Sequence, residues 1–341
     1  MKGYITLADA SLRDGNHAVR HQLTIGQIVR YAQAADEAGI DIVEVGHGNG
    51  LGASSALLGK APITDAEMLA SVRAKLRHTK LGVHFIPGLG KISDIEIAIE
   101  AGVDVFRLAS HCTEANITRR FIEYLRHVGK TAYGVLMMSH MADAREILDQ
   151  SLLMQSYGAH AIVLMDSAGF STPDLVKAKV ETLIDGLSIP IGYHAHNNLG
   201  LAVANSIAAA ESGATLLDAC VCGFGAGAGN TQLETLVPVL ERYGYQLGTD
   251  FARIARLAKC TDEVLPIRTP HIPIANIITG VFGLFSGFVP HIERLASELM
   301  IDPFELCQVL AHRKLVAGQE DVIIEEAHRL AAMKTESVAM R

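Results

Sequence analysis

Eight short apolar runs alternate with stretches of helical periodicity between Tyr4 and Cys222. The runs expected to form strands are Tyr4–Ala8, Asp41–Val45, Leu81–Ile86, Val103–Leu108, Thr131–Met137, Ala161–Met165, Ile191–His196 and Leu216–Cys222. Strands that alternate with helices pair in parallel, and eight such units predict an α/β fold closed into a (β/α)8 barrel. An open, doubly wound sheet is the alternative.

The intervening stretches carry the start and stop signals of helices. Between Ile25 and Ala35 the apolar residues recur with helical spacing. Thr24 and Gln27 form a capping-box pattern before this stretch, and Gly39 follows it as a stop signal. Similar glycines precede later runs, at Gly102, Gly158 and Gly213. This weak repeat supports a chain built from successive helix–strand units.

Composition restricts the classes of partner and the compartment. The 341 residues are 49% hydrophobic, which is enough for one large barrel and a small accessory domain. A net charge of −8 argues against nucleic acid or an anionic membrane as a partner. No uncharged apolar run reaches the ~20 residues of a membrane span. The five cysteines form no CxxC pair, and their odd number favours a cytoplasmic location.

The sequence pattern changes near residue 260. We expect a catalytic barrel over residues 1–260, a proline-rich linker over 261–273 and a helical domain over 274–341. Pro266, Pro270 and Pro273 punctuate the linker. Helical stretches follow at His291–Met300, Pro303–His312 and Glu320–Met333.

Polar residues follow or close several of the predicted strands. In a (β/α)8 barrel, the active site lies at the carboxyl ends of the strands. The residues placed there include Arg13, Asp14, His17, Glu44, His84, Ser167, His194, His196 and the run Gly223–Asn230. Their convergence on one rim predicts an active site.

Two histidines and an aspartate form a candidate metal site. His194 and His196 are two residues apart in a predicted strand, so both imidazoles project from the same face. Asp14 would add a carboxylate, and a His-His-carboxylate set leaves open positions on a catalytic ion. Alternatively, Asp14 forms a turn before Gly15, and the histidines are ordinary rim residues.

The neighbouring residues suggest roles around such an ion. Arg13 is a planar cation suited to a substrate carboxylate or a developing oxyanion. His17 could exchange protons beside the ion, or could be a solvated loop residue. Glu44, facing Arg13, would hold the guanidinium still. Ser167 could donate to a substrate carboxylate, although Asp166–Gly169 also reads as a capped helix start.

The glycine-rich run Gly223–Asn230 invites comparison with a phosphate-binding loop. It lacks the lysine of a P-loop, and it follows the last predicted strand instead of opening a dinucleotide-binding unit. A close approach of the backbone to the metal site is therefore the favoured interpretation.

These motifs together resemble a known enzyme superfamily, the pyruvate lyases and synthases that include hydroxymethylglutaryl-CoA lyase and isopropylmalate synthase. The narrower resemblance is to the 4-hydroxy-2-oxovalerate aldolase family. It is carried by Ser11–Arg20, His47–Ser55, His196–Ser206, Gly225–Asn230 and Arg313–Asp321. The resemblance covers almost the whole chain.

The resemblance implies a divalent-metal-dependent (class II) retro-aldol cleavage of a 4-hydroxy-2-oxo acid to pyruvate and an aldehyde. It assigns Asp14, His194 and His196 as ligands of Mn²⁺, with Mg²⁺ or Co²⁺ as alternatives. Arg13 would stabilise the pyruvate enolate and His17 would be the general base. Ser167 and His194 would also contact the substrate, and Glu44 and Asn230 would support these residues.

The resemblance also implies partners. The C-terminal domain of this family docks an acylating acetaldehyde dehydrogenase, which receives the aldehyde in the catabolism of aromatic compounds. We accordingly expect a hetero-oligomer with such an enzyme, and a homodimer of this chain.

Two positions depart from the family pattern. Phe285 stands where a tyrosine is usual, and His84 stands where we expect an aliphatic residue of the substrate pocket. Both residues are expected to contact the aldehyde half of the substrate. Two other functions remain open at this point. The chain could be a Claisen-type acyl-CoA synthase or lyase of the same superfamily, or a catalytically altered subunit that binds a dehydrogenase.

Overall fold

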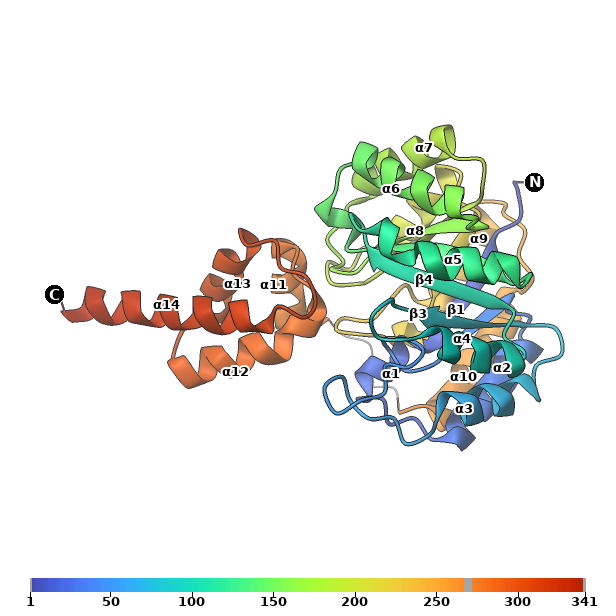
Figure 1. The fold of residues 1–341 in the computed structure, drawn as a ribbon, viewed down its shortest axis with the longest axis horizontal. Helices are drawn as coiled ribbons and strands as arrows, with labels where there is room; N and C mark the ends of the chain where they lie inside the picture. The colour runs from blue at the N-terminus through green and yellow to red at the C-terminus, as the bar shows by residue number, and fades with distance from the viewer. Residues whose placement is uncertain (1, 267–271, 340–341) are drawn as a thin grey trace.

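Eight parallel strands form a closed barrel in the computed structural model, which describes residues 2–266 and 272–339 (Figure 1). The strands are β1 (Thr6–Leu12), β2 (Ile42–Val45), β3 (Lys80–Phe85), β4 (Val105–His111), β5 (Thr131–Met137), β6 (Ala161–Asp166), β7 (Ile191–Ala195) and β8 (Leu216–Ala219). Neighbours in sequence are neighbours in the barrel, and β8 pairs with β1 through Leu7 and Leu217. This last pairing closes the sheet, so the predicted (β/α)8 barrel is confirmed.

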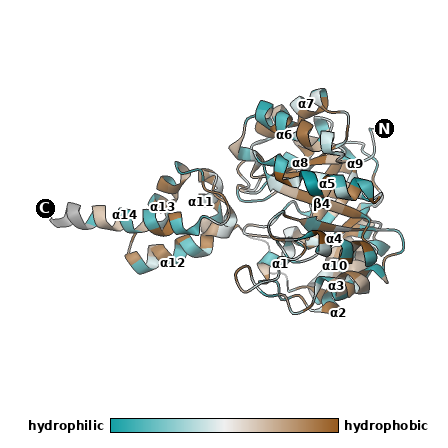
Figure 2. Cartoon of the chain, viewed as in Figure 1, coloured by the Kyte–Doolittle hydropathy of each residue, from teal (hydrophilic) through white to brown (hydrophobic). Residues whose placement is uncertain are grey.

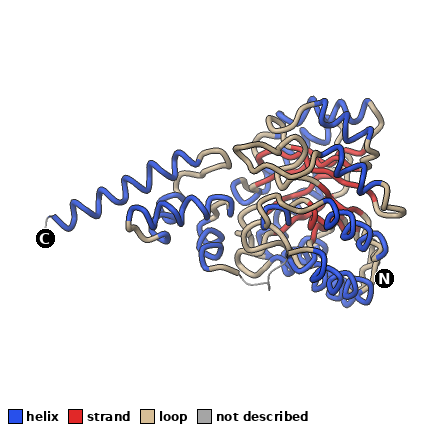
Figure 3. The backbone as a smooth tube through the Cα atoms, turned by 90° about the horizontal axis from the view of Figure 1, so that it is seen from below, coloured by secondary structure: helices blue, strands red, loops and turns tan. Residues whose placement is uncertain are grey.

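Helices surround the ring of strands, as Figure 3 shows. They are α1 (Gly15–Ala18), α2 (Ile25–Glu37), α3 (Asp65–Arg73), α4 (Ile92–Glu100), α5 (Arg119–His127), α6 (Ala144–Tyr157), α7 (Pro173–Gly186), α8 (Ala202–Glu211), α9 (Leu233–Arg242) and α10 (Phe251–Val264). Short 3₁₀ helices lie at η1 (Ala115–Thr118), η2 (Ser139–Met141) and η3 (Val221–Gly223). Among the helices that the structure describes, none is long and apolar enough to cross a membrane.

The two faces of the strands have different environments. In β4, Phe106 and Leu108 belong to the large apolar core beneath the helices, while Arg107 points the other way, into the barrel. Figure 2 shows a related contrast between the layers of the barrel, since β4 is largely brown (hydrophobic) and the outer helix α5 is largely teal (hydrophilic). Burial of one strand face under the helices thus leaves the interior face free to carry polar groups.

The signals read from the sequence of α2 are present in the structure. The amide of Gln27 donates to the Thr24 hydroxyl at 3.3 Å, and the Thr24 amide donates to the Gln27 side chain at 2.9 Å. Gly39 has a φ of 80°, in the left-handed region that favours glycine after a helix. The capping box and the stop are therefore confirmed.

Several strand boundaries differ from the prediction, and two of these differences bear on the candidate site. Strand β1 continues to Leu12, four residues beyond the predicted end at Ala8, so it leads directly into Arg13. Strand β8 stops at Ala219, because the chain then turns into η3, where Cys222 has a φ of 52°. Both changes lie at the rim that carries the candidate site.

A small group of helices follows the barrel and lies beside it in Figure 1. It comprises α11 (Ile274–Phe282), η4 (Ser286–Phe288), α12 (Val289–Leu299), α13 (Pro303–Ala311) and α14 (Glu320–Ala339). These helices bury an apolar cluster of their own, which includes Phe288 and Leu306. The last three helices match the predicted stretches, whereas α11 was not predicted. The division at residues 260 and 273 stays a prediction, and Pro270 lies outside the described residues.

Candidate active site

The barrel brings Asp14, His194 and His196 together. Each offers a ligand atom within 4.8 Å of the others, and all three side chains are buried. Asp14 directly follows the β1–Arg13 segment, while His194 lies in β7 and His196 just beyond it. The predicted grouping of one carboxylate and two imidazoles is thus present in the structure.

The protonation of this group suits a divalent cation. Burial alone would raise the pKa of Asp14, but Arg13 and the nearby histidines hold it well below its usual value. Burial lowers the pKa of His196 to about 4, so its ring is neutral near pH 7. His194 Nε2 and His196 Nδ1 are buried and lack a hydrogen-bond partner among the described residues. Two ring nitrogens without partners, one of them on the neutral His196 ring, together with a carboxylate fit the donor set of a catalytic metal.

Asp218 orients His194. Its carboxylate lies 2.9 Å from His194 Nδ1. Burial opposes ionisation of Asp218, but Arg107 and His194 keep its pKa below the usual value. The carboxylate accepts the Nδ1 proton, which leaves Nε2 as the ligand atom. Asp218 and Arg107 were not among the predicted site residues. The signal that could have identified each of them is a charged residue inside an apolar strand.

A series of buried charged residues runs from Asp14 through the barrel to His194. Starting at the rim, Arg13 Nη1 contacts Asp14 at 2.8 Å, and Arg13 Nε contacts Glu44 at 3.1 Å. Glu44 then lies 3.4 Å from Arg107, which also contacts Asp218. With His194, whose Nδ1 contacts Asp218, as the sixth member, these residues form what we call the charge network. Four buried ion pairs and one hydrogen bond thus connect two metal-ligand candidates.

Glu44 and His84 lie inside the barrel beneath Arg13. Glu44 is fully buried, and Arg107 and Arg13 hold its pKa well below normal although burial opposes this. Burial, reinforced by Arg13, lowers the pKa of His84 to about 4. The His84 Nδ1 atom is 3.4 Å from Glu44 Oε1. The structure therefore places His84 against the carboxylate that holds Arg13, and its predicted contact with substrate remains a prediction.

His17 lies in α1, one short turn after Asp14. Its side chain is half-buried, and burial lowers its pKa although Asp14 opposes this shift. The neutral imidazole is the form that a general base needs. Its ring meets that of His21 edge-on, at a centroid distance of 5.1 Å.

The loop after β8 approaches the ligand group through its backbone. The Asn230 side chain and the Ala226 amide donate to Asp14 Oδ2, at 2.7 and 3.2 Å. A Cβ at Gly225 would lie 2.8 Å from the same oxygen. The predicted close approach of this glycine run is confirmed, and Asn230 contacts Asp14 as its supporting role requires.

The Ser167 hydroxyl has no hydrogen-bond acceptor among the described residues. It is buried, and its hydroxyl oxygen accepts the amide of Met138 at 3.0 Å. Asp166 caps the following turn, since its carboxylate accepts the amides of Phe170 and Ser171. Both readings of this segment thus have a counterpart in the structure: the turn is capped by Asp166, and the Ser167 proton can be donated elsewhere.

Phe285 belongs to the C-terminal helices. Its ring packs edge-on against Phe288, at a centroid distance of 5.6 Å. The next residue, Ser286, accepts a hydrogen bond from Asn198 at 2.9 Å, and Asn198 lies two residues after His196. The backbone beside Phe285 is therefore attached to the rim, while its predicted contact with substrate stays a prediction.

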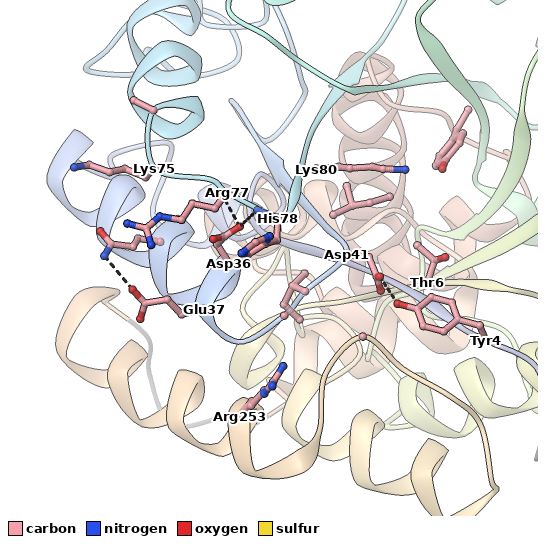
Figure 4. Close-up of a pocket in the computed structure, with 17 residues that line it drawn as sticks. Tyr4, Thr6, Asp36, Glu37, Asp41, Lys75, Arg77, His78, Lys80 and Arg253 are labelled. Carbon is pink, nitrogen blue, oxygen red and sulfur yellow. Dashed lines mark hydrogen bonds between the residues drawn. The ribbon is translucent and has the colours of Figure 1, made fainter.

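A separate cavity of about 970 Å³ opens at the other end of the barrel (Figure 4). Its acidic residues are occupied by local contacts, as Asp36 accepts three backbone amides and Asp41 contacts Tyr4. Lys75 and Lys80 extend in opposite directions in Figure 4. The cavity shares no lining residue with the ligand group.

Comparisons with known proteins show the family of the chain. A family model described as HMGL-like matches residues 4–261, and one described as a DmpG-like communication domain matches residues 270–332. A 4-hydroxy-2-oxovalerate aldolase of Burkholderia pseudomallei is 64% identical over 327 residues, covering 96% of this chain and 94% of the relative. The protein of the same name from Pectobacterium atrosepticum is 48% identical over 335 residues, covering 98% of each chain.

Solved structures extend the likeness of the fold. The carboxyl transferase domain from Rhizobium etli pyruvate carboxylase matches with a TM-score of 0.79 and 18% sequence identity. The match covers 96% of this chain and 60% of that chain. At this identity the likeness concerns the fold alone.

Proposed function

We propose that this chain cleaves a 4-hydroxy-2-oxo acid to pyruvate and an aldehyde. The chain belongs to the HMGL-like family and is a carbon–carbon lyase related to the 4-hydroxy-2-oxovalerate aldolases. A substrate such as 4-hydroxy-2-oxopentanoate would give acetaldehyde. The observation that carries the proposal is the group of Asp14, His194 and His196, with Arg13 and His17 beside it.

Asp14, His194 and His196 would hold a divalent cation, for which we propose Mn²⁺, with Mg²⁺ or Co²⁺ as substitutes. When bound, such an ion supplies Lewis acidity toward the carboxylate and the 2-oxo group of the substrate. His194 is prepared for ligation because Asp218 holds its Nδ1 proton. The Asp14 carboxylate is held by Arg13 and Asn230.

Arg13 and Ser167 would orient the pyruvate half of the substrate. Glu44 and Asp14 fix the Arg13 guanidinium, so its cationic edge needs little reorganisation to stabilise a developing enolate. The Ser167 hydroxyl accepts the Met138 amide and can donate its own proton to the substrate carboxylate. Both groups are buried, which strengthens their electrostatic effect.

His17 would act as the general base. Its imidazole takes the proton of the C4 hydroxyl, and the C3–C4 bond breaks as the aldehyde forms at C4. The electron pair of that bond moves between C3 and C2 and gives an enolate, whose negative charge lies near Arg13. Protonation at C3 then yields pyruvate. No lysine Schiff base is required.

We also propose a protein partner, an acylating acetaldehyde dehydrogenase that receives the aldehyde, and a homodimer of this chain. The match to a communication domain supports this assignment. The C-terminal helices also expose apolar side chains, including Ile274, Val281 and Met300. Mixing the two purified proteins should give a larger species in size-exclusion chromatography, and separate elution would contradict the assembly.

The cleavage is tested by coupling pyruvate release from 4-hydroxy-2-oxopentanoate to lactate dehydrogenase, with Mn²⁺ added or removed by a chelator. We expect release that requires the ion and disappears in His194→Ala. Full activity without metal would contradict the metal centre. No pyruvate, together with thiol release from an acyl-CoA, would instead indicate a Claisen-type reaction.

A further inference from the structure

The loop that follows β2 surrounds the segment carrying Arg13 and His17. The Asn16 side chain donates to the Gly46 carbonyl at 2.8 Å, which attaches the first turn of the site to this loop. Arg13 Nη1 lies 3.4 Å from the Gly48 carbonyl oxygen. The Gly48 backbone also acts to raise the pKa of His17, against the lowering by burial. The Gly48 backbone therefore lies beside both residues proposed to act on the substrate.

Gly48 is in direct contact with His17. A Cβ at residue 48 would lie within 2.6 Å of three atoms of the His17 ring: Cδ2 and Nε2 at 2.5 Å, and Cε1 at 2.6 Å. The φ of Gly48 is not in the left-handed region, so its backbone conformation would suit any residue. The absence of a side chain at this position is needed for space and not for backbone freedom.

Two further histidines hold the Gly48 peptide in place. The Gly48 amide donates to His21 Nδ1 at 3.3 Å, and the His21 ring stacks on His47 at 3.6 Å. His47 is itself fixed, because its Nε2 donates to the Gly59 carbonyl at 3.0 Å and its Nδ1 accepts the Asn49 amide at 3.2 Å. Burial lowers the pKa of His21 to about 3, so these supports carry no positive charge near pH 7.

We propose that Gly48 is a positioning residue for the general base. Its backbone lies against the His17 ring and holds the imidazole in the orientation from which a ring nitrogen can accept the proton of the substrate hydroxyl. Its missing side chain is the space that the His17 ring occupies. The inference rests on the role given to His17 in the proposed function, and it explains the sequence His47-Gly48-Asn49-Gly50, which the metal site itself does not require.

A double-mutant cycle on the full-length protein with Mn²⁺ tests this inference. Two rates are measured: pyruvate release from 4-hydroxy-2-oxopentanoate, and exchange of the pyruvate C3 protons with deuterated water. Gly48→Ala should slow pyruvate release by about 10²-fold, because the base is displaced by a fraction of its own width. Proton exchange should continue, since it does not need removal of a C4 hydroxyl proton. Gly26→Ala is the matched control, because a Cβ there meets nothing within 4 Å.

The His17→Ala background decides the result. If Gly48 acts through His17, adding Gly48→Ala to His17→Ala should change pyruvate release by less than about twofold. If the two losses multiply, Gly48 acts elsewhere and the inference is overturned. A wild-type protein that releases no pyruvate contradicts the proposed function itself, so the two failures are distinguishable.

A second variant covers the case in which Gly48→Ala does not fold. His21→Phe keeps an aromatic ring on His47 but removes the acceptor of the Gly48 amide. It should slow pyruvate release by about fivefold, the effect of one hydrogen bond, with proton exchange retained. In the His17→Ala background this loss should vanish. A loss of the same size in both backgrounds would overturn the inference.

Discussion

The position of a single proton on His194 depends on residues that never reach the rim. Asp218 accepts that proton, and Arg107 keeps Asp218 ionised from deeper in the barrel. Without the carboxylate, either ring nitrogen of His194 could carry the proton. His194 therefore needs the buried Asp218 carboxylate to be a metal ligand, and Asp218 needs the buried Arg107 cation to offset its desolvation.

Asp218→Asn should weaken binding of Mn²⁺ by about 10–100-fold, because the neutral amide does not fix the His194 tautomer. Isothermal titration with the metal measures this effect independently of turnover. Asp104→Asn, at a half-exposed ion pair with Arg73, is the matched control and should leave the affinity unchanged. Equal affinities for wild type and Asp218→Asn would show that the pair has no role in ligation.

Elements were predicted better than their ends, and β1 shows why. The predicted strand Tyr4–Ala8 ends before Asp9, and aspartate is a residue type that is depleted in strands. In the structure Asp9 is buried beneath α2, where it accepts hydrogen bonds from the Tyr31 hydroxyl at 2.5 Å and the Ser11 amide at 2.8 Å. A distant tyrosine thus allows the strand to continue, and no local pattern contains that information.

The candidate site divides in the same way. Asp14, His194 and His196 were found because their spacing and their place at strand ends carry the signal. Arg107 and Asp218 were not predicted, because these two partners lie 111 residues apart in the sequence and meet only when the barrel closes. Local pattern identifies the groups that face a ligand, whereas the groups behind them depend on tertiary contacts.

Asp36→Ala should destabilise the connection between α2 and β3. The Asp36 carboxylate accepts the amides of Arg77, His78 and Thr79, all within 3.0 Å. Losing this acceptor should lower the free energy of unfolding by about 1–3 kcal/mol, measured by urea denaturation. Glu37→Ala is the control, because among the described residues the exposed Glu37 side chain hydrogen-bonds only Gln33, on the same helix. Equal losses in the two variants would contradict this account.

At the scale of the whole molecule, one buried amide joins the barrel to the C-terminal helices. Asn198 Nδ2 donates to the Asn276 carbonyl at 3.0 Å and to Ser286 Oγ at 2.9 Å. Gly227 packs closely against the same two residues, since a Cβ at this position would lie within 2.8 Å of Asn276 and Ser286. Two rim loops that contact the metal-ligand group thus share one attachment to these helices.

Asn198→Ala should loosen this attachment while leaving the barrel intact. Amide hydrogen exchange in α11 and η4 should rise by about 25-fold, the equivalent of two lost hydrogen bonds, with exchange in α2 unchanged. Asn116→Ala, at an exposed position in η1, is the matched control. Unaltered exchange in α11 would mean that other contacts hold the helices.

Buried neutral histidines predict the acid sensitivity of the metal-free protein. Burial lowers the pKa of His21 to about 3 and those of His84 and His196 to about 4, from a usual 6.5. Between pH 6.5 and 4 the unfolded chain binds protons at these sites and the native protein does not, so stability falls with falling pH.

Urea denaturation in the presence of a chelator, repeated across that range, measures this slope. We expect His84→Leu to flatten it, because one of the three groups is removed. A free energy of unfolding that stays constant from pH 6.5 to 4 would contradict the neutral state of these rings.

The charge network also bears on how this barrel can acquire new specificities. Glu44 and Arg107 each pair with two other members of the network, so a substitution at either residue disturbs neighbours that must change with it. The interior of β5 and β6 is different, since Val135, Val163 and Met165 make an apolar cluster with no charge to balance. Directed evolution toward other aldehydes should therefore accept single substitutions along β5 and β6 and require concerted ones across β2, β4 and β8. The barrel thus has an apolar wall that should tolerate single substitutions and a charged wall that should not.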